Sequence, residues 1–177
     1  MFSFVKTKNN PILNEVLKYE KQAHYCLKKF KRLNGQEIID VENKTVESSL
    51  FFASNPKEQN SYKLHLNPFI EIIETSINGL NFNPYQYLSQ ENKDSETTIA
   101  CLPQVFFEGY KEIELDQIAI NILSIIFEEG SSIIFHQLKQ KATALFDRTD
   151  NDEQAIDALL ISKLKYLVGN NLCYIRL

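Results

Sequence analysis

Long apolar runs are missing from this 177-residue sequence, and their absence excludes the membrane-spanning classes. No stretch approaches the roughly 18 consecutive apolar residues that a transmembrane helix requires. Residues 1–10 contain neither a continuous apolar segment nor a small-residue cleavage site of the kind found in secretory signals. We therefore expect a cytoplasmic protein with no membrane span.

Glycine is also scarce, with five residues in the chain, which leaves little backbone for loops that cradle phosphate groups. The GxGxxG, GxxxxGK[ST], GxSxG and HExxH motifs are all absent. The nearest approach to paired carboxylates is Glu128 and Glu129, which are adjacent on a predicted helix and so point about 100° apart. The sequence nominates no catalytic residue and no cofactor, and it favours a protein that is not an enzyme.

Cysteine and histidine are few and scattered. The three cysteines, Cys26, Cys101 and Cys173, fit neither a disulfide framework nor a CxxC motif, because they are odd in number and far apart. None of the three histidines has a second ligand at the spacing that would place two donors on one face of a helix or strand. We expect buried cysteines and no metal site.

What the sequence does contain is the composition of a globular protein, with 44% hydrophobic and 24% charged residues. Its length suits one large domain or two small ones. Residues 1–35 carry eight Lys or Arg and two Glu, whereas residues 36–111 carry five Lys or Arg and eleven acids. Positive charge is therefore concentrated early in the chain, although the net charge is −4.

A long helix is predicted from Asn10-Pro11, which suit an N-cap and a first helical position, to Gly35. We expect its apolar face to pack on the rest of the chain. The alternative is pairing with a second copy, so a monomer and a homodimer through this helix both stay open. That face follows an alternating spacing of four and three residues: Ile12, Val16, Tyr19, Ala23, Cys26, Phe30 and Leu33.

A basic patch lies near the end of the same predicted helix, at Lys28, Lys29, Lys31 and Arg32. Such a cluster suits phosphates or an acidic partner. It is also typical of a solvated helix end, where cations stabilise the C-terminal dipole.

The middle of the chain reads as strands. Residues 36–41, 45–53 and 62–66 are rich in residues that favour strands and are separated by polar turns, which predicts a small antiparallel sheet. Residues 68–75 fit both periods imperfectly, and we interpret them as a helix. Residues 89–97 are polar and nearly free of apolar side chains, so we predict a linker there.

The last part of the chain has clearer patterns. Residues 98–108 and 111–115 predict a hairpin, and Asp116 suits the cap of the helix that follows. Further elements are predicted as helices over 117–129, 133–146 and 152–168 and a strand over 172–177. We expect an α+β protein with three parts: a long helix and small sheet over 1–88, the linker over 89–97, and a winged-helix-like module over 98–177.

The hairpin, helix, helix, helix, strand order resembles a winged helix. More narrowly, KEIELDQIAINIL (111–123) resembles the strand-to-helix passage of PqqD-like peptide-recognition domains, and ALLISKLKYLVGNNL (158–172) resembles that family's last helix. Two features depart from the family: a strand follows the last helix, and residues 1–97 have no counterpart. The resemblance implies a peptide between the hairpin's last strand and the last helix, contacting Lys111, Ile113, Leu115, Leu160, Lys163 and Leu164.

Charge decides between the functions that a winged helix suggests. Affinity for duplex DNA comes largely from Lys and Arg that neutralise phosphates, yet the predicted reading helix begins among acids and carries Asp157. We therefore predict a protein- or peptide-binding adaptor or accessory subunit. The alternatives are a DNA-binding transcriptional regulator anchored by the basic first helix, and a regulatory subunit or fragment associated with a methyltransferase.

Overall fold

The computed structural model describes residues 11–75, 97–104, 109–146 and 153–177. These residues form an α+β fold in which helices surround two antiparallel three-stranded sheets. One sheet has the strand order β2-β3-β4 and the other has the order β5-β1-β6. The chain therefore belongs to the predicted class.

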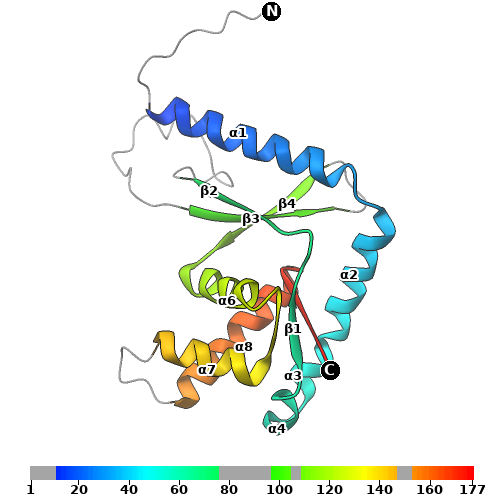
Figure 1. Cartoon of the computed structure of the whole chain (residues 1–177), viewed down its shortest axis with the longest axis vertical. Helices are drawn as coiled ribbons and strands as arrows, with labels where there is room; N and C mark the ends of the chain where they lie inside the picture. The colour runs from blue at the N-terminus through cyan, green and yellow to red at the C-terminus, as the bar shows by residue number, and fades with distance from the viewer. Residues whose placement is uncertain (1–10, 76–96, 105–108, 147–152) are drawn as a thin grey trace, which may run out of the picture.

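The first sheet lies between helices (Figure 1). It consists of β2 (Glu71–Thr75), β3 (Thr97–Pro103) and β4 (Tyr110–Leu115), and α1 (Pro11–Phe30) lies across one face. Because side chains alternate along a strand, the two faces bury different residues. Ile73, Ile99 and Cys101 pack with α1, whereas the opposite face contributes to the main core. The face of α1 that carries Cys26 and Phe30 thus docks within the chain, as predicted.

The pairing of the two predicted hairpin strands and the cap after them are confirmed, although residues 105–108 of the predicted first strand lie outside the described residues. Strands β3 and β4 pair antiparallel, with Ala100 opposite Ile113. The Asp116 carboxylate accepts a hydrogen bond of 2.9 Å from the backbone N–H of Ala119 and caps α6 (Gln117–Glu128). Gly130 follows with φ of 74°, a left-handed conformation that glycine adopts without a Cβ penalty and that ends the helix.

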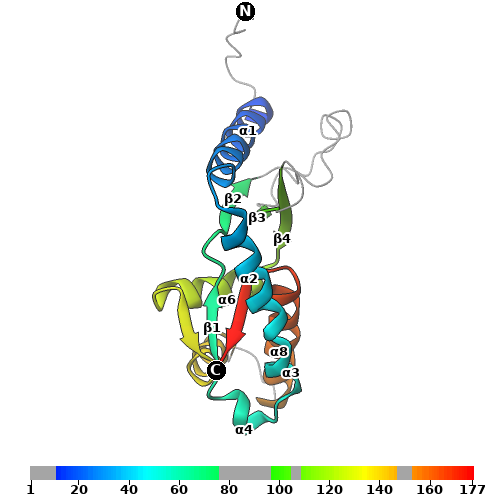
Figure 2. The same cartoon turned by 90° about the vertical axis from the view of Figure 1, so that its right-hand side faces the viewer.

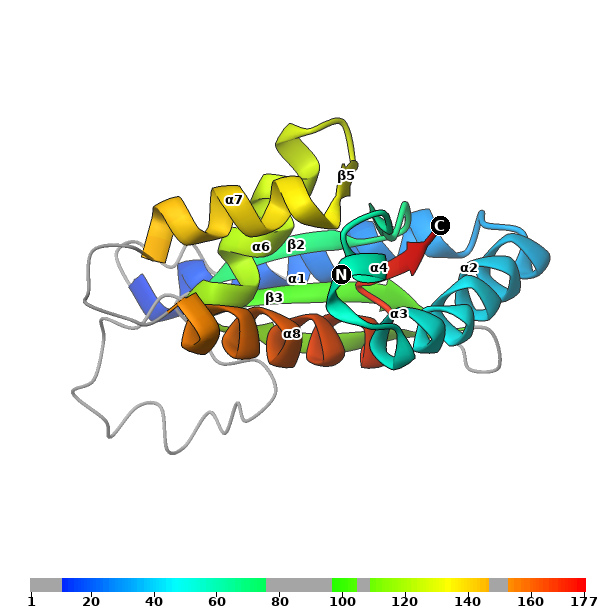
Figure 3. The same cartoon turned by 90° about the horizontal axis from the view of Figure 1, so that it is seen from below.

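Four further elements complete this part of the chain. Strand β5 (Ser132–Ile134) occupies the start of the predicted second helix, and α7 spans Phe135–Phe146. Helix α8 (Glu153–Gly169) and strand β6 (Cys173–Arg176) match the predicted last helix and closing strand. Helices α6, α7 and α8 lie on the face of the β2-β3-β4 sheet opposite α1 (Figure 3).

Residues 36–53 are helical, so the two strands predicted there are wrong. Asn34 caps α2 (Gly35–Glu47) by accepting a hydrogen bond from the backbone N–H of Gln36 at 3.0 Å. Two short helices follow, α3 (Ser49–Ala53) and α4 (Pro56–Gln59). The β-branched residues suggested strands, but the buried side chains of α2 recur at helical spacing: Ile38, Val41 and Thr45.

The helix predicted over residues 68–75 is also wrong, because residues 71–75 form β2. Ile73 and Thr75 are buried, whereas Ile72 and Glu74 are exposed, which is the two-residue period of a strand. Pairing with β3 over five residues selects that period.

The division into residues 1–88 and 98–177 does not match the sheets. The strand predicted over residues 62–66 is present as β1 (Lys63–Leu66). It lies between β5 and β6, which come from the C-terminal part of the chain. Conversely, β2 pairs with β3, across the predicted linker. Non-local strand pairing therefore joins both halves into each sheet. Residues 89–96 of the predicted linker lie outside the described residues, and Thr97 begins β3.

The main core joins these layers. It includes Phe51 from α3, Leu64 from β1 and Leu164 from α8, all fully buried. Helix α2 runs beside β6 (Figure 2), where the Ser48 hydroxyl accepts a hydrogen bond of 2.7 Å from the backbone N–H of Ile175. This contact covers part of the edge of the second sheet.

Candidate binding site

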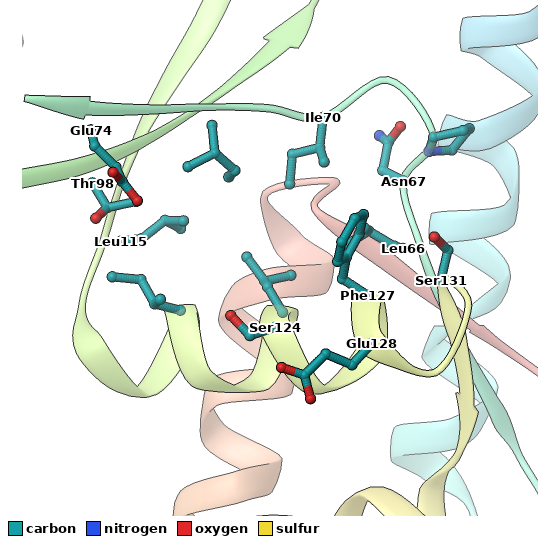
Figure 4. A pocket seen from close by; sticks show the side chains of 14 residues that line it. Leu66, Asn67, Ile70, Glu74, Thr98, Leu115, Ser124, Phe127, Glu128 and Ser131 are labelled. Atoms are coloured by element: carbon teal, nitrogen blue, oxygen red, sulfur yellow. The ribbon is translucent and has the colours of Figure 1, made fainter.

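A cavity of about 520 Å³ lies between β2 and α6 (Figure 4). Its volume falls within the range of ligand pockets, roughly 300–1,000 Å³. The lining is mainly apolar and comes from three places, namely β2 and its neighbours, α6, and the turn before β2: Leu66, Pro68, Ile70, Ile72, Leu115, Ile120, Leu123 and Phe127. Polar side chains are placed around this lining: Asn67, Glu74, Thr98, Ser124, Glu128 and Ser131.

Local structure explains why these side chains meet. The alternation of β2 directs Ile72 and Glu74 away from α1 and into the cavity. On α6, Ile120, Ser124 and Phe127 recur at intervals of four and three residues, so they share the helix face that is turned towards the cavity and β2.

Asn67 holds the turn that closes one end of the cavity. Its side-chain amide donates a hydrogen bond to the backbone carbonyl of Asn171 at 2.7 Å, and its side-chain oxygen accepts one from the backbone N–H of Phe69 at 2.9 Å. These two bonds connect the turn before β2 to the loop before β6. The end of the cavity is thereby built on hydrogen-bonded backbone.

Two large apolar side chains in the lining face water. Phe127 is 67% exposed and Ile72 is 45% exposed. Covering either side chain with a ligand would favour binding, because burial of apolar surface contributes about 25 cal/mol per Å² to the free energy. A ligand that covers both side chains would provide that gain.

Two carboxylates flank the apolar lining from opposite elements, Glu74 from β2 and Glu128 from α6 (Figure 4). Neither makes an ion pair with any of the described residues. Both are exposed. The cavity therefore combines an apolar interior with a negatively charged rim.

The predicted peptide-binding residues do not form an open surface. Ile113, Leu115, Leu160 and Leu164 are buried in the main core. These four side chains are therefore unavailable to a ligand in this conformation, and the assignment of a peptide to β4 and α8 stays a prediction. Of the six, Leu115 alone also lines the cavity.

Polar contacts also link β4 and the residue after it to α8 and the turn that follows α8. The Lys111 ammonium donates to the Asn170 side chain at 3.0 Å, and Lys163 pairs with Asp116. The Tyr166 hydroxyl donates to the backbone carbonyl of Glu114 at 2.9 Å. Although burial opposes it, hydrogen bonding from Lys163 and from the Ala119 N–H lowers the pKa of Asp116, so this capping carboxylate stays ionised.

The basic patch is split by the fold. Lys29 turns towards the sheet and pairs with Glu71, whose hydrogen bond raises the pKa of Lys29. Lys28, Lys31 and Arg32 are exposed. The patch therefore contributes three exposed cations.

The cysteines are buried, as predicted. Burial raises the pKa of Cys173 to about 12, and burial also raises the pKa of Cys26 and Cys101. Because the thiolate is the reactive form, these protonated thiols are poor nucleophiles at neutral pH. Nearby, burial and the hydrogen bond to Glu112 raise the pKa of Tyr19.

Within the described ranges, no group of three or more His, Cys, Asp or Glu side chains is placed to hold a metal ion. No helix in that part of the chain combines the length and apolar character needed to cross a bilayer. Comparisons with protein-family models, with curated proteins and with solved structures found no match.

The sequence did not predict the cavity, because its lining combines residues 66–74 with Thr98 and with residues 115–131. One signal was available. Phe127 lies on a helix whose buried face is already supplied by Ile122, Leu123, Ile125 and Ile126, so its ring had no place in the core.

Proposed function

We propose that this chain is a non-enzymatic adaptor or accessory subunit that binds an apolar segment of a partner protein in the cavity between β2 and α6. The observation that carries the proposal is the apolar lining with two exposed large side chains, Phe127 and Ile72. A concave, mainly apolar lining with a few polar groups around it is the usual form of a binding site.

The rim specifies the partner further. Glu74 and Glu128 have no cationic partner among the described residues, so a ligand with Lys or Arg beside its apolar side chains would match them. Complementary charge at a rim mainly affects association rate and selectivity, while the apolar contact supplies most of the affinity.

A winged-helix-like module remains part of this proposal in a changed form. The order α6, β5, α7, α8, β6 supports it, with β1 taking the place between β5 and β6. The hairpin β3-β4 lies in the other sheet. In α8, Asp157 pairs with Lys139 of α7 at 2.6 Å. The acidic balance of residues 112–177, six Lys or Arg against ten Asp or Glu, supports a protein partner over duplex DNA for this module.

Two matched peptides test the proposal. Both are short labelled peptides of alternating leucine and serine, one flanked by lysines and the other by glutamates, and binding is measured by fluorescence anisotropy. We expect the lysine-flanked peptide to bind roughly tenfold more tightly. The double substitution Glu74→Lys/Glu128→Lys should reverse that preference.

The apolar contact is tested with exposed positions, so that the variants fold. The double substitution Ile72→Ser/Phe127→Ser should abolish binding of both peptides. The matched control is Val46→Ser/Leu50→Ser, which removes two apolar side chains of similar exposure, 73% and 63%, elsewhere on the surface. Equal loss of binding in both variants, or none in either, would refute a site between β2 and α6.

A further inference from the structure

The outer face of α1 is a second surface of distinct chemistry. One face of the helix packs on the sheet through Tyr19, Ala23, Cys26 and Phe30. At 100° per residue, the side chains on the opposite face are mostly basic or aromatic. Besides the exposed Leu17, this face carries the outer stripe, defined as Lys18, Lys21, His24, Tyr25 and Lys28 and continued past the end of the helix by Lys31 and Arg32.

Most cations of the stripe have no acidic partner within the described part of the chain. Lys18 approaches Glu15 at 3.9 Å, at the limit of an ion pair. Lys21, Lys28, Lys31 and Arg32 make no such contact there and are exposed. Four like charges gathered on one solvent-facing line create a local positive potential, although the net charge of the chain is −4.

Aromatic rings are placed among these cations. Tyr25 is 60% exposed and lies between Lys21 and Lys28 on the same side of α1. His24 is adjacent and also exposed. Rings interleaved with cations match a single-stranded nucleic acid, whose phosphates are neutralised by Lys and Arg and whose unpaired bases stack on rings.

The same observations disfavour other anionic partners. A membrane-binding helix inserts its apolar face, and that face of α1 is buried against Ile73, Ile99 and Cys101. An acidic peptide would match the cations and leave the Tyr25 ring without a stacking partner.

We propose that the outer stripe of α1 binds single-stranded nucleic acid. The strand lies along the helix, and Lys18 to Lys28 alone extend about 15 Å at about 1.5 Å per residue. About four phosphates are neutralised, and Tyr25 stacks on a base. This surface faces away from the cavity, because α1 and α6 lie on opposite faces of the β2-β3-β4 sheet (Figure 1).

The first test uses a labelled oligothymidylate and fluorescence anisotropy. For single strands, affinity falls with salt in proportion to the phosphates neutralised, with a slope of about −0.7 for each. Four phosphates predict a loss of about 50-fold between about 50 mM and about 200 mM salt. No binding at the lower salt concentration would overturn the proposal.

Two pairs of variants assign the contact. Lys21→Glu/Lys28→Glu should weaken binding by at least about tenfold, whereas Lys57→Glu/Lys63→Glu, with the same change in net charge at exposed positions away from α1, should leave most of it. Tyr25→Ala should weaken binding about tenfold, and Tyr25→Phe, which keeps the ring, should retain it. Equal losses in the two lysine pairs, or no loss in Tyr25→Ala, would contradict the proposal.

Competition separates the kinds of polyanion. Unlabelled oligothymidylate should displace the probe at a much lower concentration than polyglutamate or a duplex of equal length. If polyglutamate or the duplex competes equally well, base stacking plays no part and the assignment to single strands is wrong.

Discussion

The two faces of the β2-β3-β4 sheet are packed very differently. On one face, α1 is held by a small cluster that includes Cys26, Phe30 and Cys101, with polar contacts at its margins. On the other, the sheet joins the main core, which extends through α6 and α8 to the second sheet. The free energy gained by burial grows with the apolar area buried, so the main core on the α6 and α8 side of the sheet contributes most of the stability. Helix α1, on the other face, is held by the smaller cluster and should detach from the sheet before the main core unfolds.

The largest expected effect is in the main core. Leu164 of α8 is fully buried, so Leu164→Ala should lower the free energy of unfolding by about 3–4 kcal/mol through lost burial and a residual cavity. The matched control is Leu159→Ala, on the same helix at a side chain that is 37% exposed; it should lower the free energy of unfolding by less than about 1 kcal/mol. Urea denaturation measures both, and equal costs would refute this core.

An intermediate effect is expected for Phe30→Ala, which weakens the cluster beneath α1. Because this cluster is small, we expect a loss of about 2–3 kcal/mol, at or below the low end for Phe→Ala in a core, together with faster reaction of Cys26 and Cys101 with a thiol reagent. Cys173, in the main core, should stay protected. Mass mapping of the modified thiols distinguishes the sites. Tyr25→Ala, on the outer face of the same helix, is the control; modification of all three cysteines together would show that α1 opens only with the whole protein.

The smallest effect concerns pH. His65 stacks on Tyr174 in the second sheet, and burial, with the nearby Lys63, Arg176 and Lys44, lowers its pKa. The unfolded chain therefore binds a proton more readily than the folded one. Stability from this group is present above the unfolded pKa of about 6.5 and decreases as pH falls below it. Urea titrations across this range should show the decrease, and His65→Gln should remove that part of it.

Local signals in the sequence predicted several elements correctly. The cap at Asp116, the hairpin before it and the last helix each depend on contacts between residues close in the chain. The strand predictions for residues 36–53 failed because they relied on the β-branched residues of this segment. The helical spacing of Ile38, Val41 and Thr45 was the better guide. For the predicted peptide site, Leu160 and Leu164 were correctly placed on a helix, but the sequence alone did not show that both side chains are fully buried in the main core.

By itself, the sequence determined the α+β class, the buried cysteines and the apolar face of α1 that docks on the chain, because each follows from composition or from a period within one segment. Tertiary structure decided which strands pair, and therefore where the cavity forms. Strand β1 joins β5 and β6, and β2 joins β3, through pairings between residues far apart in the chain. Such pairings depend on the packing of the whole core, so no local pattern encodes them and the cavity between β2 and α6 exists only in the folded chain.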